Sequence, residues 1–104
     1  MKIEVTSKTD SLSPALREYA ETKLAAVERL GEEFRASEVV FSSERDELVC
    51  EVILHRHRGE PFIAQDRARE GRLAVDGVAA KIEKQFLRFK EKRTQMHRRP
   101  KNDD

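Results

Sequence analysis

Residues 81–93, KIEKQFLRFKEKR, hold the side chains of this chain that are best suited to bind a polyanion. The segment has six Lys or Arg residues and two Glu residues, whereas the formal net charge of the whole chain is only +1. If the segment is helical, with about 100° between successive residues, four cations lie on one flank of its apolar stripe: Lys81, Lys84, Arg88 and Lys92. Cations about one turn apart can contact neighbouring phosphates of a nucleic acid and displace the counterions bound to those phosphates. This pattern favours nucleic-acid binding at this segment.

A lysine of another expected helix supports this interpretation. Lys23 projects within the apolar stripe that contains Ala20 and Leu24, so its ammonium has to reach water along the groove between the helices. There it could join the cationic row of the last helix. The simpler interpretation of the row is a solvated face near a helix C-terminus, where cations are favoured. An anionic membrane fits poorly, because Phe86 and Phe89 are needed for the core.

The charge is distributed unevenly along the chain. Residues 1–70 have a net charge of −4, residues 71–99 of +6, and residues 100–104 of −1. The nearly neutral total therefore hides a dipolar molecule whose basic end could meet a polyanion.

The remaining reactive residue types give little support for catalysis or metal binding. His55 and His57 share one face of an expected strand, a spacing that could begin a metal site. Cys50 lies on the opposite face, and only His97 remains as a third ligand. The sequence has no glycine-rich phosphate loop and no nucleophile motif. We therefore expect a protein that is not an enzyme and that uses no metal, cofactor or small-molecule substrate.

Composition also bears on the compartment. The single cysteine excludes an internal disulfide and is typical of a reducing compartment. The N-terminus has no apolar run long enough for a signal peptide, and no later segment could span a bilayer. We expect a cytoplasmic protein with no membrane partner.

The elements that position these residues follow the order β-α-β-β-β-α. Ile3 and Val5 alternate with polar residues, as in a short strand. Ser13 followed by Pro14 predicts a helix start, and the apolar stripe of this helix runs to Leu30, where the following glycine at position 31 could cap it.

Three further strands and a long helix complete the prediction. Strands are expected over 37–44, 48–57 and 61–66, with Cys50, Val52 and Leu54 on the covered face of the second of these. The last helix is expected to begin between Glu70 and Leu73 and to end in the mid-nineties. Its apolar seam is Val75, Val78, Ile82, Phe86 and Phe89. The fold class is therefore α+β, with two helices packed on one face of a four-stranded sheet. We expect one domain over 1–96 and a polar, disordered tail over 97–104.

The two helical segments together resemble the ribosome hibernation-promoting factor family, also described as the ribosome-associated inhibitor or sigma-54 modulation family. That family's first helix has an ALREF-like start followed by a lysine and a Leu-Glu pair; here these are Ala15-Leu16-Arg17-Glu18-Tyr19, Lys23 and Val27-Glu28. Its last helix opens with an AID-G motif and continues with spaced cations; here these are Ala74-Val75-Asp76-Gly77, Lys81-Ile82, Lys84-Gln85-Phe86, Arg88 and Lys90-Glu91-Lys92. The resemblance covers residues 1–95.

The resemblance implies a fold like that of a double-stranded-RNA-binding domain and binding to the small ribosomal subunit, in the channel for tRNA and mRNA. It implies inhibition of translation during ribosome hibernation, a stress response. The rRNA-binding residues that it implies, in contact with 16S rRNA, are Lys23, Lys81, Lys84, Arg88, Lys90, Lys92 and Arg17. Recognition would depend on shape and phosphate rather than on base sequence. The chain resembles the short form of the family and is expected to be a monomer when free.

Two positions depart from the family pattern. Glu70-Gly71-Arg72 stands where relatives commonly have Asp-x-Tyr, which leaves the start of the last helix open. Ala26 stands where they often have a further lysine. Two other functions stay open: a general binder of structured RNA, and an interaction module whose basic helix binds an acidic protein.

Overall fold

The computed structural model describes residues 2–10, 12–30 and 34–102, without the side chains of Glu28 and of residues 93–102. Its elements follow the predicted order and are β1 (Lys2–Ser7), α1 (Pro14–Ala25), the 3-10 helix η1 (Ala26–Leu30), β2 (Phe34–Glu44), β3 (Glu47–Arg56), β4 (Phe62–Ala68) and α2 (Gly71–Asn102). The α+β prediction is confirmed.

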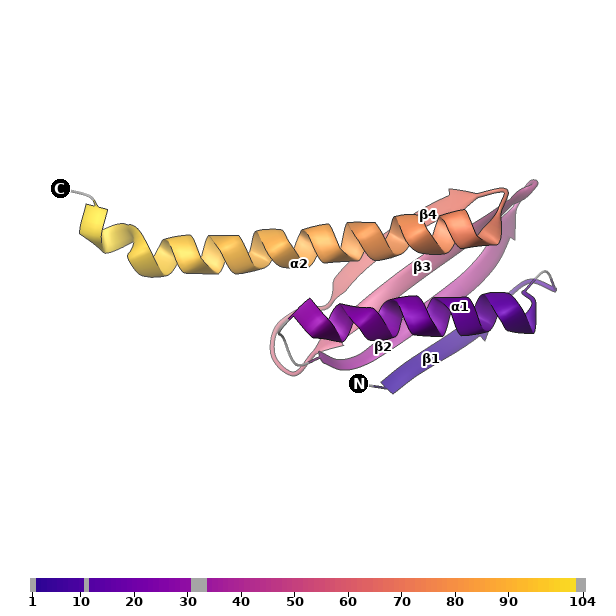
Figure 1. Ribbon diagram of the computed structural model, residues 1–104, viewed down its shortest axis with the longest axis horizontal. Helices are drawn as coiled ribbons and strands as arrows, with labels where there is room; N and C mark the ends of the chain where they lie inside the picture. Colours follow the sequence, from indigo (N-terminus) through magenta and orange to yellow (C-terminus); the bar gives the residue numbers. More distant parts are fainter. Residues whose placement is uncertain (1, 11, 31–33, 103–104) are drawn as a thin grey trace.

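The four strands form one sheet in the order β1-β2-β3-β4, in which β1 is parallel to β2 and the other neighbours are antiparallel. Both helices lie on the same face of this sheet (Figure 1). Cys50, Val52 and Leu54 of β3 are fully buried on the covered face, as their alternation predicts. The opposite face has no helix over it in the described part of the chain.

Helix α1 begins as the sequence predicts but ends earlier. Ser13 is the N-cap, and its side-chain oxygen accepts a hydrogen bond from the Leu16 backbone N–H at 3.1 Å. After Ala25 the chain continues as η1, and the Ala26 N–H that closes α1 bonds to the carbonyls of Leu24 and Thr22. The apolar stripe that predicts one helix to Leu30 is therefore divided between α1 and η1. The glycine cap expected at position 31 lies outside the described residues.

Helix α2 begins at Gly71, which answers the question raised by Glu70-Gly71-Arg72. A Cβ atom at Gly71 would lie 2.4 Å from the Leu16 Cδ2 atom, so a glycine lets the start of α2 approach α1 closely. The helix ends at Asn102, later than the mid-nineties expected, because residues 90–99 are mostly Lys, Arg, Gln, Glu and Met, which favour a helix. The backbone at 97–102 is thus helical, and the division into a domain and a disordered tail stays a prediction.

The core lies between the helices and the sheet. Four members of the predicted seam of α2 are fully buried, namely Val75, Val78, Ile82 and Phe86. The fifth, Phe89, is only partly buried and packs against the core. Phe86 packs edge-to-face on Phe34, with ring centroids 5.5 Å apart. This packing fixes the rotation of α2 about its axis, and so decides which of its flanks holds each cation.

Candidate nucleic-acid interface

Helix α2 has two polar flanks that meet different parts of the protein. One flank borders β4: the Lys81 ammonium donates to the Gln65 carbonyl at 2.9 Å, and the Gln85 amide donates to the Ile63 carbonyl at 2.7 Å. The other flank borders α1 and η1, where the Lys90 ammonium donates to the Leu30 carbonyl at 3.3 Å. The predicted cations of α2 are therefore divided between two surfaces.

The flank beside β4 holds the row that the helical periodicity predicts. Lys84, Arg88 and Lys92 are exposed, and within the described residues they form no hydrogen bond or ion pair. They lie at intervals of four residues, about 6 Å apart along the axis. That distance is close to the spacing of successive phosphates along a nucleic-acid strand. We call these three residues, together with Lys81, the cationic row.

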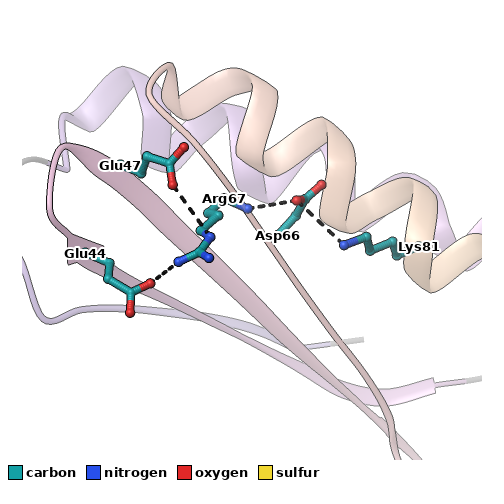
Figure 2. Close-up of polar contacts among 5 residues, drawn as sticks. All are labelled: Glu44, Glu47, Asp66, Arg67 and Lys81. Atoms are coloured by element: carbon teal, nitrogen blue, oxygen red, sulfur yellow. Dashed lines mark hydrogen bonds and ion pairs between the residues drawn. The ribbon is translucent and has the colours of Figure 1, made fainter.

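Lys81 differs from the other three members of the row, because the protein supplies it with partners. Its Nζ atom lies 3.6 Å from Asp66 Oδ1, and the same carboxylate accepts a hydrogen bond from the Arg67 backbone N–H at 2.8 Å (Figure 2). Asp66 approaches α2 at Gly77, where a Cβ atom would lie 1.8 Å from Asp66 Oδ2. The side chain of Lys81 is still about half exposed, so it remains accessible to a phosphate.

Lys23 does not join the cationic row. It lies in the groove between the helices, as predicted, but on the other flank of α2, where its ammonium is 3.3 Å from Asp76 Oδ1. Asp76 also accepts a hydrogen bond from the Tyr19 hydroxyl at 2.6 Å. The expectation that Lys23 extends the row is therefore wrong, because helical projection alone cannot tell which flank of α2 faces α1.

The contacts of Asp76 alter two pKa values. The Tyr19 hydroxyl, with Lys23 and Arg72 nearby, holds the pKa of Asp76 below its usual range, because the hydrogen bond stabilises the carboxylate. The same hydrogen bond raises the pKa of Tyr19, because ionisation would remove the donated proton. Asp76 is thus ionised at neutral pH and offsets part of the positive charge of Lys23.

Arg17 and Lys90, the remaining predicted contacts, also interact with the protein itself. The Arg17 guanidinium donates to the Val5 carbonyl at 3.2 Å, on the β1 side of α1. Besides its bond to Leu30, the Lys90 ammonium lies 5.7 Å from the centre of the Phe86 ring. The row on α2 and the residues Lys23, Lys90 and Arg17 thus lie on different sides of the helical layer, and the roles of all seven in RNA binding stay predictions.

Two arginines that the sequence did not single out lie near these surfaces. The Arg56 guanidinium stacks on Phe89 at 4.4 Å from the ring centre, and Arg72 lies over Tyr19 at 4.9 Å. The position of Arg56 at the end of an alternating strand could have marked it as a binding residue. Its contact with Phe89 of α2 could not be predicted, because the two residues are distant in sequence.

The described residues contain no group of three or more His, Cys, Asp or Glu side chains placed to hold a metal ion. His55 instead lies against the Glu38 carboxylate, with Nε2 and Oε2 2.6 Å apart. Burial raises the pKa of Cys50 to about 12, which keeps it a neutral thiol. Among the described residues, no helix is both long and apolar enough to cross a bilayer.

Comparison with solved structures supports the fold. A structure described as a ribosomal subunit interface protein from Coxiella burnetii superposes with a TM-score of 0.75 at 24% identity, covering 88% of this chain and 99% of that one. The Thermus thermophilus Protein Y N-terminal domain superposes with a TM-score of 0.74 at 23% identity, covering 86% of this chain and 99% of that domain.

Comparison of sequences identifies the family. A ribosome hibernation promoting factor from Salmonella typhimurium is 30% identical over 92 residues, which are 88% of this chain and 96% of that protein. One from Azotobacter vinelandii is 26% identical over 92 residues, which are 88% of this chain and 85% of that protein. The family model described as Sigma 54 modulation protein / S30EA ribosomal protein matches residues 3–94. The chain therefore belongs to this family of ribosome hibernation factors.

Proposed function

We propose that this protein binds the small ribosomal subunit and inhibits translation during ribosome hibernation. The proposed contact is with 16S rRNA in the channel that tRNA and mRNA occupy. Membership of the family and the names of its relatives support an association with ribosomes. In this proposal the protein acts in the cytoplasm, as a monomer that blocks a site rather than as an enzyme.

The observation that carries the proposal is the state of Lys84, Arg88 and Lys92. These cations lie along one exposed flank of α2, and no carboxylate of the described residues neutralises them. Like charges four residues apart on a helix repel by about 0.2–0.5 kcal/mol per pair. A phosphate backbone removes this repulsion and releases its own counterions, so the row favours structured RNA as its partner.

The rRNA surface we propose is centred on the cationic row, with Lys81 as its end beside Asp66. Lys23, Lys90 and Arg17 make a weaker contribution in this proposal, because each already has a partner within the protein. The contacts are to phosphate and sugar, so they carry affinity and orientation rather than base specificity.

Sedimentation with purified small subunits through a sucrose gradient tests the proposal. We expect the wild-type protein to migrate with the subunit at low salt, and the triple variant K84E/R88E/K92E to stay at the top. The matched control K2E/K8E/R35E reverses three exposed cations that belong to β1, the turn after it and β2 rather than to α2, and it should migrate like the wild type. Wild-type protein that stays at the top contradicts ribosome binding, whereas equal migration of both triple variants contradicts our assignment of the surface.

The dependence of affinity on salt separates RNA from an acidic protein as the partner. About four phosphate contacts predict that log Kd changes with log salt with a slope of magnitude roughly 3 to 4. Equal affinity for subunits and for unrelated structured RNA would instead indicate a general RNA binder.

A further inference from the structure

The sheet face opposite the helices carries a second, differently charged surface. Side chains alternate along each strand, so the residues on this face follow from the register of the buried ones. The strand pairing places Glu4 beside Glu38, Glu38 beside Ile53, and Ile53 beside Ile63, in one row across all four strands. The next row contains Thr6, Val40, Glu51 and Gln65.

Apolar side chains occupy the β3–β4 side of this face. Ile53 and Ile63 are direct cross-strand neighbours, and Ile63 is 50% exposed, unusually high for an isoleucine in a sheet. Val40 of β2 adds to them diagonally through its pairing with Glu51. This apolar group is available for contact with another molecule.

Carboxylates occupy the β1–β2 side of the face and extend to β3. Glu4 and Glu38 are direct neighbours on parallel strands, an arrangement in which like charges destabilise a sheet. Glu51 lies diagonally from Glu38. Glu38 contacts His55, whereas Glu4 and Glu51 form no ion pair within the described residues.

At the end of the sheet near the β2–β3 turn, in contrast, glutamates are paired with a cation of the protein itself. There Arg67 lies between Glu44 and Glu47 and forms ion pairs with both, at 3.6 Å from Nε to the Glu47 carboxylate (Figure 2). The protein thus neutralises that pair of glutamates with its own cation. Lys2 and Arg35 line the same hollow as Glu4 and Glu38, but within the described residues neither forms an ion pair with Glu4. The repulsion among Glu4, Glu38 and Glu51 would be relieved by a cation from outside.

We infer that the open sheet face binds an extended protein segment rich in Lys and Arg, whose apolar side chains contact Ile53 and Ile63 while its cations pair with Glu4, Glu38 and Glu51. Charge complementarity favours this occupant and disfavours a nucleic acid, whose phosphates the three carboxylates would repel. Because strands lie about 4.8 Å apart and an extended chain advances about 3.3 Å per residue, roughly six residues cross the sheet.

The segment lies on the face rather than extending the sheet at an edge. Three helix side chains bond to outward carbonyls of the edge strands: Arg17 to Val5 of β1, and Lys81 and Gln85 to Gln65 and Ile63 of β4. A strand that paired with either edge would have to break these bonds.

The two surfaces of the protein would then bind partners of opposite charge, an RNA on the cationic row and a basic protein segment on the sheet face. The cationic row belongs to α2, which lies on one side of the sheet (Figure 1), and the strand register places the acidic residues on the other side, so both can be occupied at once. The pairing with RNA on the first surface rests on the proposed function. Binding of a basic protein segment on the second does not depend on it.

Fluorescence anisotropy with a labelled synthetic peptide of alternating Arg and Val tests the inference without ribosomes. We expect binding by the wild-type protein that weakens by about threefold to a hundredfold in E4Q/E38Q/E51Q, since each exposed ion pair contributes about 1.4-fold to fivefold. The control E18Q/E60Q/E91Q removes three exposed carboxylates elsewhere and should bind like the wild type. I63S should weaken binding without a change in its salt dependence.

Three results would overturn the inference. The first is no binding by the wild-type protein at low salt. The second is an equal loss in both triple variants, which would mean attraction by net charge alone. The third is dimerisation of the free protein, seen by sedimentation equilibrium, that E4Q/E38Q/E51Q abolishes; this would make a second copy of the chain the occupant. Because K84E/R88E/K92E should leave peptide affinity intact, failure here is distinct from failure of ribosome binding.

Discussion

Replacement of Gly77 by alanine tests how closely α2 approaches Asp66. The added Cβ atom would lie 1.8 Å from Asp66 Oδ2 and 2.8 Å from its Cγ, so the whole carboxylate has to rotate away. It would then lose the hydrogen bond from the Arg67 N–H, which contributes about 0.5–1.5 kcal/mol, and the half-exposed ion pair with Lys81, which contributes about 0–1 kcal/mol.

The helix gains from the same substitution, because alanine is favoured over glycine inside a helix by about 1 kcal/mol. We therefore expect G77A alone to change the free energy of unfolding by between about −1.5 and +0.5 kcal/mol, where a negative sign means destabilisation. In a D66A background the obstruction is absent, and G77A should stabilise the protein by about 1 kcal/mol. The coupling between the two positions is then about 0.5–2.5 kcal/mol.

Urea denaturation followed by far-UV circular dichroism measures all four members of this double-mutant cycle. D46A, which removes an exposed carboxylate paired with Arg69, is a matched background in which G77A should act as it does in the wild type. Equal effects of G77A in the wild-type and D66A backgrounds, within about 0.3 kcal/mol, would refute the close contact.

Three further predictions concern the core and the titrating groups. Phe86→Ala should lower the free energy of unfolding by about 3–5 kcal/mol in urea denaturation, because the ring is fully buried, and a loss below about 1 kcal/mol would mean that it is not in the core. Tyr19→Phe removes the hydrogen bond that lowers the pKa of Asp76. In the wild type this bond stabilises the fold at neutral pH and is lost as the pH falls through the folded pKa of Asp76. The variant should therefore lose less stability on acidification, measured by unfolding from about pH 7 to 2. An identical acid profile would contradict this. Burial raises the pKa of Cys50 to about 12, so a thiol reagent at neutral pH should react much more slowly with the folded protein than in denaturant, and equal rates would show that Cys50 is accessible.

The division of the cations changes how the family's basic surface is understood in this protein. Lys23 and Lys81 have carboxylate partners, and Arg17 and Lys90 bond to backbone carbonyls. Phosphate binding at these residues has to compete with contacts that already exist. At Lys84, Arg88 and Lys92 no such competitor is found within the described residues, so these three should dominate the dependence of affinity on salt.

The sequence by itself determined the features that depend on local periodicity. Ser13 and Pro14 predict the start of α1, the three-and-four spacing of Val75 to Phe86 predicts the buried seam of α2, and the same period places Lys84, Arg88 and Lys92 on one flank. Alternation likewise predicts which side of β3 is buried. These features follow from short-range geometry, so one chain segment is sufficient to specify them.

Only the tertiary structure decided which surface each flank meets. The rotation of α2 on Phe34 and Phe86 sets Lys81 beside Asp66 and Asp76 beside Lys23, and the strand register sets Glu4 beside Glu38. These pairs join residues that are distant along the chain, so no period within a segment can predict them. The helical period places cations on a flank, but packing of the whole core determines which of them the protein neutralises itself.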